Sequence, residues 1–168
     1  MSLLHWASLS ALVIAACAAD VRTRRIPNAV VLGGLLVGLG LQALTPQGSG
    51  LFAPHQPGGL GLPAGAQAAA LMLVITLIAW RLRFFGAGDA KLLIAVSSFF
   101  GPAGVLPLCL ATLIVGGVQA LVTVHFTSNI LAGGRLACEP AVARLPYSVA
   151  IGSASLVFAA AATFGLWR

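Results

Sequence analysis

Long apolar runs alternate along this chain with short stretches that hold nearly all of its charges. A membrane-spanning helix needs about 20 predominantly apolar residues, so the length of each uncharged run predicts how many helices it contains. The first run predicts one helix over Leu3–Ala19, and the last run, Leu145–Trp167, predicts another. No Lys or Arg precedes the first run, as a cleaved signal peptide would require, so we expect this helix to be retained.

The run Ile26–Trp80 is too long for a single membrane crossing. Its middle, Thr45–Gly65, is rich in Gly and Pro, which predicts a loop rather than a helix. The apolar sequence on either side of that loop predicts helices over Asn28–Leu44 and Ala66–Leu82.

The run Leu92–Gly134 also has room for two helices. The dipeptide Gly101-Pro102 predicts a break between a short helix that ends near Phe100 and a longer one that ends near Phe126. The whole pattern therefore predicts an all-α polytopic membrane protein, with six transmembrane helices in a single domain over residues 1–168.

The basic residues fix the expected orientation, because positively charged connections stay in the cytoplasm. Three connections of the six-helix chain carry them: Arg22, Arg24 and Arg25; Arg81, Arg83 and Lys91; and Arg135 and Arg144. All three connections lie on one side of the membrane, and only the C-terminal Arg168 disagrees. This distribution predicts that both termini lie outside the cytoplasm.

Composition agrees with a lipid environment and excludes a soluble globular protein. Charged residues make up 7% of the chain, where a soluble domain has about 25%. The hydrophobic fraction is 60% and the mean hydropathy is +1.04. The net charge of +6 does not indicate nucleic-acid binding, because the basic residues mark connections between helices and form no continuous polar stripe.

Side chains suited to metal binding are few and scattered. The three cysteines and three histidines are Cys17, Cys109, Cys138, His5, His55 and His125. They form no CxxC pair and no pair of histidines at i and i+4. We therefore expect neither a metal site nor a cofactor.

The chain has only three acids, and two of them are expected at the same membrane depth. Asp20 ends the first helix and Asp89 begins the fourth, both on the cytoplasmic side, while Glu139 lies in the last basic connection. Acids at the edge of membrane segments are costly and usually face a bundle interior or a wet cavity. A simpler interpretation is that each aspartate neutralises a nearby basic residue, such as Arg22 or Lys91.

Two carboxyl groups that converge can share one proton, because neighbouring like charges raise one of the two pKa values. The ionised partner can then take a proton from an attacking water while the protonated partner donates to a peptide carbonyl. Two glycines, Gly86 and Gly88, precede Asp89 and would allow close backbone approach or a positive φ. The pair would titrate together, so the sequence assigns no separate role to Asp20 or Asp89.

Three segments together resemble the prepilin peptidases, which are bacterial aspartic intramembrane proteases of the GxGD class. They are Asp20-Val-Arg-Thr-Arg-Arg-Ile-Pro-Asn28, Gly86-Ala-Gly-Asp-Ala-Lys-Leu92 and Leu145-Pro-Tyr-Ser-Val-Ala-Ile151. The resemblance implies a six-helix bundle with a polar cleft open to the cytoplasm, and Asp20 and Asp89 as the catalytic pair. It also implies a substrate, a type IV prepilin or pseudopilin cleaved after the glycine that ends its basic leader, at the cytoplasmic face of the bacterial inner membrane.

The resemblance is to the short form found with tight-adherence (Flp-type) pilus systems. Bifunctional relatives carry an N-terminal domain with a zinc-binding cysteine tetrad, and no such segment precedes Asp20, so we expect no N-methyltransferase activity. Two other functions stay open: a proton-coupled transporter or channel with both aspartates as relay groups, and a structural pilus-assembly partner. Transporters usually place such acids near the membrane midplane, whereas both aspartates here are expected at one edge.

Four other residues have structural interpretations. Pro27 and Asn28 suit the turn that enters the second helix. Lys91 is expected to meet lipid phosphate, and Tyr147 to lie in the interfacial aromatic belt.

Overall fold

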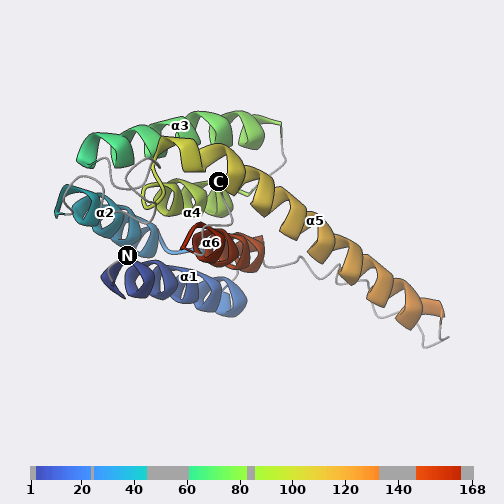
Figure 1. Cartoon of the computed structure of the whole chain (residues 1–168). Helices are drawn as coiled ribbons and strands as arrows, with labels where there is room; N and C mark the ends of the chain where they lie inside the picture. Colours follow the sequence, from blue (N-terminus) through green and yellow to red (C-terminus); the bar gives the residue numbers. More distant parts are fainter. Residues whose placement is uncertain (1–2, 24, 45–60, 83–85, 133–146, 164–168) are drawn as a thin grey trace.

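A computed structural model describes residues 3–23, 25–44, 61–82, 86–132 and 147–163 of the chain. Six helices account for nearly all of these residues (Figure 1). They are α1 (Leu3–Thr23), α2 (Asn28–Leu44), α3 (Leu62–Arg81), α4 (Ala87–Ser97), α5 (Pro102–Ala132) and α6 (Tyr147–Thr163). The all-helical prediction is confirmed, and the bounds predicted for α2 agree with the structure.

Three predicted boundaries are wrong. α1 continues to Thr23, so Asp20 lies within its last turn and does not end the helix. The segment Leu62–Gly65 was predicted as loop but forms the first turn of α3. Pro63 is tolerated at this helix start, and Gly61, the residue before the helix, adopts a positive φ of 86°, which glycine allows. α5 runs six residues beyond Phe126 to Ala132.

The break between α4 and α5 was predicted correctly. Gly101 has a φ of 74°, which favours glycine, and α5 begins at Pro102. Buried Gln42 of α2 donates from Nε2 to the carbonyls of Ser98 and Phe99, at 3.4 and 3.3 Å. The carbonyls freed where α4 ends thus find a partner from another helix, which an apolar environment requires.

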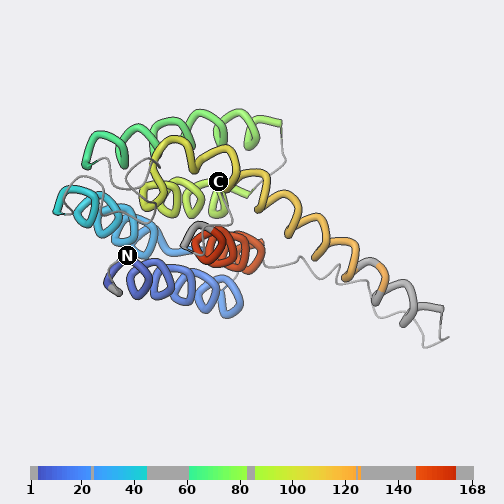
Figure 2. Tube along the Cα trace, in the orientation of Figure 1, coloured from blue at the N-terminus to red at the C-terminus, as the bar shows by residue number. Residues whose placement is uncertain are grey.

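The short helix α4 lies at the centre of the bundle. It contacts α2, α3, α5 and α6. The other five helices form a closed ring around it in the order α1, α2, α3, α5 and α6, and α6 contacts α1 again (Figure 2). Most of α4 beyond its first turn is buried. With 11 residues it is about 17 Å long, too short to cross a hydrocarbon core of about 30 Å.

Within the part of the chain that the structure describes, three helices are long and apolar enough to cross a membrane: Leu4–Thr23, Leu62–Arg81 and Pro102–Thr123. α2 and α6 are shorter apolar helices. Large apolar side chains such as Leu36, Leu73 and Ile114 project from the outer surface, as expected where the solvent is lipid. The chain is a membrane protein, and its six-span count and orientation stay predictions.

Three segments far apart in sequence come together at one end of the bundle. The C-terminal end of α1 and the N-terminal ends of α4 and α6 all lie at that end, and α5 extends past them there (Figure 1). Glu139 and the two basic residues of the same connection, Arg135 and Arg144, lie outside the described residues.

Candidate active site

Asp20 of α1 is held by a residue of the last helix. The hydroxyl of Ser148, in the first turn of α6, donates to Oδ2 of Asp20 at 2.5 Å. Ser148 is completely buried and Asp20 is half-buried. A hydroxyl that donates to a carboxylate at this distance makes a strong, charge-assisted hydrogen bond.

α6 approaches α1 closely because one residue of the contact has no side chain. A β-carbon at Gly152 would lie 2.5 Å from Cγ1 of Val13 and 3.3 Å from Sγ of Cys17. Gly152 is one helical turn beyond Ser148, and Cys17 is nearly one turn before Asp20, so these residues share the facing sides of the two helices. The thiol of Cys17 also donates to the carbonyl of Ser148, at 3.4 Å.

Asp89 lies in the first turn of α4, three residues after the N-cap Gly86. Its carboxylate accepts a hydrogen bond from the backbone N–H of Gly86, as an acid three residues after an N-cap does in a capping box. A β-carbon at Gly86 would lie 2.9 Å from Oδ2 of Asp89, so a larger residue there would displace the carboxylate. A β-carbon at Gly88 would meet Ile26 only at 3.6 Å or more, an ordinary contact distance.

The two glycines therefore differ in what the structure requires of them. Gly86 has a φ of −71°, so its need for glycine comes from the carboxylate that lies over it and not from its backbone conformation. The sequence predicted close approach or positive φ without deciding between them. The structure selects close approach, and the approaching group is Asp89 of the same chain.

The structure brings Asp20 and Asp89 into electrostatic contact. The pKa of Asp89 is raised to about 6, chiefly by burial and also by the negative charge of Asp20, while the Gly86 hydrogen bond opposes both effects. Asp89 precedes the apolar run that starts at Leu92 and lies outside the three candidate spans. The two acids, 69 positions apart, thus act on each other at one end of the bundle.

Neither aspartate forms an ion pair with a basic residue in the part of the chain that the structure describes. Lys91 instead donates from Nζ to Oδ1 of Asn28, at 2.9 Å, which links α4 to the start of α2. The carbonyl of Pro27 accepts from the N–H groups of Val30 and Val31 and so begins α2. Arg24, another basic residue close to Asp20 in the sequence, lies outside the described residues.

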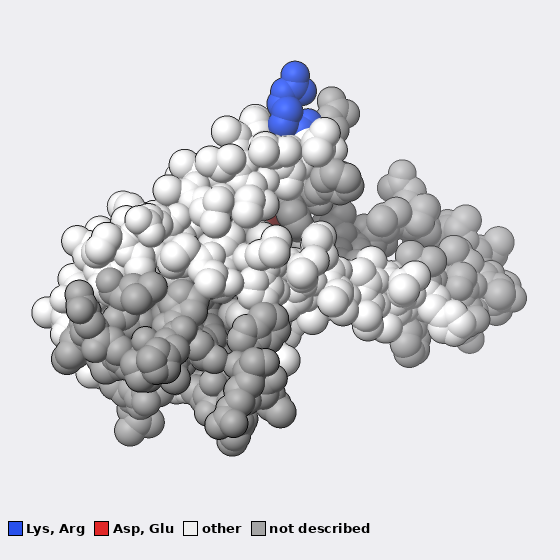
Figure 3. All heavy atoms as spheres, turned by 45° about the horizontal axis from the view of Figure 1, so that its top comes forward, with Lys and Arg blue, Asp and Glu red and all other residues white. Residues whose placement is uncertain are grey.

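Tyr147 also faces the acids. A β-carbon at Gly116 of α5 would lie 2.6 Å from the Tyr147 hydroxyl oxygen, so the ring packs directly on that glycine. The tyrosine hydroxyl is within range of the Asp89 charge. On the face shown in Figure 3 the described surface is mostly white, basic side chains in blue project at the top, and a small red area of acidic residue appears in a recess.

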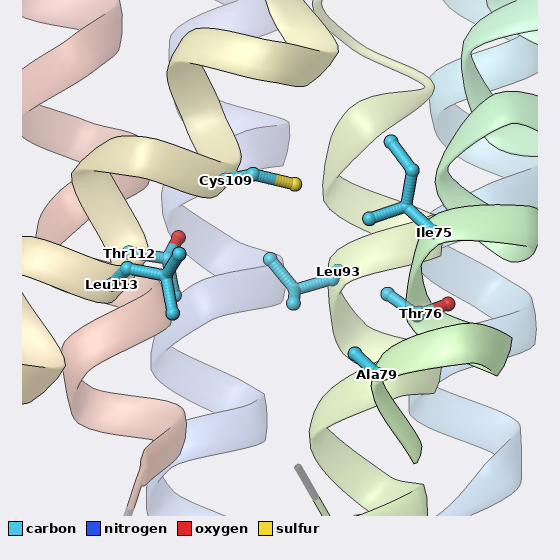
Figure 4. Close-up of a pocket in the computed structure, with 7 residues that line it drawn as sticks. All are labelled: Ile75, Thr76, Ala79, Leu93, Cys109, Thr112 and Leu113. Carbon is cyan, nitrogen blue, oxygen red and sulfur yellow. The ribbon is translucent and has the colours of Figure 1, made fainter. Parts of the chain in front are cut away.

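An apolar cavity of about 220 Å³ adjoins this region, between α3, α4 and α5 (Figure 4). It is lined by Ile75, Thr76, Ala79, Leu93, Cys109, Thr112 and Leu113. Leu93 is one helical turn after Asp89 on α4. The hydroxyls of Thr76 and Thr112 bond to carbonyls of their own helices, at 2.7 and 2.8 Å, so the walls offer no unpaired hydroxyl.

Ser148 lies within the third motif but was not predicted as a site residue. Its contact with Asp20 joins residues 128 positions apart, and no local pattern signals such a contact. Among the described residues, no group of three or more His, Cys, Asp or Glu side chains could hold a metal ion.

Comparison with known families gives one match. A sequence model of the type IV leader peptidase family matches residues 7–121, which include both Asp20 and Asp89 and end before α6. No curated protein and no solved structure matches the chain. Because the match covers more than half of its length, the chain belongs to the type IV leader peptidase family.

Proposed function

We propose that this chain is an aspartic endopeptidase that removes the short basic leader from type IV prepilin-like precursors of the Flp type, with Asp20 and Asp89 as its catalytic pair. The observation that carries the proposal is the electrostatic coupling of these two acids, from α1 and α4, in a member of a leader peptidase family. Coupled carboxyl groups that share a proton supply both a base and an acid near neutral pH.

The hydrolysis proceeds by general acid–base catalysis. The ionised carboxylate removes a proton from a water molecule as the water oxygen forms a bond to the peptide carbonyl carbon. The protonated carboxyl group gives its proton to the carbonyl oxygen, which produces a neutral gem-diol. When the C–N bond breaks, the amine takes the proton that came from the water, and a gem-diol hydroxyl returns a proton to the other carboxyl group.

The proposed site faces the cytoplasm of a bacterial cell. It lies at the end of the bundle where α1 ends and α4 begins, next to Arg22 and Lys91. Connections rich in basic residues remain on the cytoplasmic side of the inner membrane. A prepilin with a basic leader would therefore meet the aspartates before its export.

The test uses the full chain in liposomes with a synthetic Flp-type precursor, and mass spectrometry of the products. We expect cleavage after the glycine that ends the leader, and loss of this cleavage in Asp20→Asn and in Asp89→Asn. Glu139→Gln, which removes the third acid of the chain, is the matched control and should cleave normally. Cleavage by either aspartate variant would refute the catalytic pair, and proton flux without any cleavage would instead support a transporter.

A further inference from the structure

The hydroxyl of Ser148 donates to a different kind of acceptor from those of the other described serines on α6. Ser153 and Ser155 donate to carbonyls of their own helix, those of Val149 and Gly152, at 2.8 Å each. Ser148 instead donates across to another helix, to Oδ2 of Asp20. Ser148 is the second residue of α6, so no carbonyl of α6 lies three or four positions before it and its hydroxyl is available to Asp20.

This hydrogen bond distinguishes the two oxygens of the Asp20 carboxylate. Oδ2 accepts from a donor that is completely buried and cannot exchange freely with solvent. The carboxylate is therefore fixed in rotation, and Oδ1 is the oxygen left to accept a proton from water. A donated hydrogen bond also favours the charged form of a carboxylate over its protonated form.

The packing around Ser148 keeps the donor in place. The Gly152 backbone lies against Val13 and Cys17, and the Cys17 thiol donates to the Ser148 carbonyl. These contacts fix α6 against the face of α1 that carries Asp20. Two further titratable groups interact with the aspartates: the Cys17 thiol of α1 with the charge of Asp20, and the Tyr147 hydroxyl of α6 with the charge of Asp89.

We propose that Ser148 is a positioning residue of the aspartate pair, which holds Oδ2 of Asp20 so that Oδ1 acts as the base toward water and Asp89 acts as the acid. The inference rests on the proposed function and adds a division of roles to it. Oδ1 of Asp20 takes the proton from water and later passes it to the leaving amine, while Asp89 protonates the carbonyl oxygen and recovers a proton from the gem-diol. The raised pKa of Asp89 agrees with its place as the proton carrier.

The test compares Ser148→Ala with Ser155→Ala in the precursor cleavage assay. Ser155 is also completely buried and lies two turns further along the same side of α6, so its variant removes a comparable hydroxyl away from Asp20. We expect Ser148→Ala to lower kcat by about 10- to 100-fold with little change in KM, as for loss of one charge-assisted hydrogen bond. Ser155→Ala should retain the wild-type kcat and KM, so a loss confined to kcat in Ser148→Ala distinguishes positioning of the carboxylate from a general effect on the fold.

Ser148→Thr keeps the hydroxyl and is expected to retain most of the wild-type kcat, with a lower yield of folded protein if the added methyl group crowds α1. Wild-type kcat in Ser148→Ala would overturn the inference and leave the proposed function standing. A loss of kcat in Ser148→Ala that Ser155→Ala shares would also overturn it. Failure of the wild-type chain to cleave any precursor would refute the proposed function itself.

Discussion

The carboxylate of Asp89 lies directly over Gly86, at 2.9 Å from the position that a β-carbon would occupy. The same carboxylate accepts a hydrogen bond from the Gly86 N–H. Gly86 therefore provides both the free space that the carboxylate occupies and a hydrogen-bond donor to it. Gly88, the other glycine of the motif, has no such contact.

Exchange of the two glycines for alanine should therefore have unequal effects. We expect Gly86→Ala to displace the Asp89 carboxylate and to lower cleavage of a prepilin-like precursor by about 10-fold or more, since misplacement by 1 Å can cost about 100-fold. Gly88→Ala adds a methyl group at an ordinary distance from Ile26 and should stay within about threefold of wild type. Initial rates for both variants, normalised to folded protein, decide the matter, and equal losses would contradict the assignment.

The raised pKa of Asp89 predicts how stability depends on pH. The folded protein binds this proton up to about pH 6, whereas the unfolded chain releases it near 3.8, so ionisation of Asp89 weakens the fold as the pH rises between these values. Asp89→Asn removes that ionisable group and keeps the shape of the side chain. Its melting temperature should exceed that of wild type at pH 8, and the difference should shrink toward pH 4.

Thermal unfolding in detergent at both pH values measures this effect independently of catalysis. Lys91→Gln serves as the control, because its exposed hydrogen bond to Asn28 contributes little and is not tied to Asp89. A wild-type protein more stable than Asp89→Asn at pH 8 would show that the carboxylate is not disfavoured by burial.

The same coupling predicts the basic limb of the activity profile. In the proposed mechanism the two aspartates share one proton, and the pKa of Asp89 is raised to about 6. We expect kcat/KM of the wild-type enzyme to fall as the pH rises above about 6 to 7, with an apparent value that belongs to the pair. A rate that stays constant from pH 6 to pH 9 would rule out a protonated Asp89 as the acid.

The sequence predicted helices well where charges and breakers bound an apolar run, and less well elsewhere. The bounds of α2 follow from Pro27 at its start and the Gly- and Pro-rich segment after Leu44. The end of α5 was predicted near Phe126, where no charge or breaker stands, although Gly133 and Gly134 directly follow its true end at Ala132. Run lengths also count helices without saying which one is central, and the place of α4 inside the ring depends on packing between helices.

The candidate site, like the fold, could be predicted from the sequence only in part. That Asp20 and Asp89 lie at one end of the bundle follows from the alternating direction of successive helices. That Ser148 reaches Asp20 depends on how closely α6 approaches α1, which the absence of a side chain at Gly152 permits. Such contacts join segments distant in sequence and leave no periodic pattern in either segment.

Substitution of Gln42, which lies far from the aspartates, is expected to lower the free energy of unfolding strongly. Its amide satisfies two carbonyls at the end of α4, and Gln42→Leu would leave them buried with one partner fewer. We expect a loss of about 2–4 kcal/mol, since each buried group left without a hydrogen bond costs about 1–3 kcal/mol. Gln67→Leu changes an exposed glutamine of α3 in the same way and should be nearly neutral in unfolding experiments; similar losses in both variants would contradict the role of Gln42.

Leu93 separates the apolar cavity from the interior of the bundle, and its truncation should be correspondingly costly. The side chain is 1% exposed and borders a space of about 220 Å³, so Leu93→Ala joins a new void to an existing one. Truncation of a buried leucine costs about 2–5 kcal/mol and more where the surroundings cannot collapse, which places this variant in the upper part of that range. Leu113→Ala removes the same atoms from a residue of the cavity rim that is 50% exposed, so less contact is lost and its unfolding free energy should change by about 1 kcal/mol or less. Equal losses for the two leucines would show that the cavity collapses around position 93.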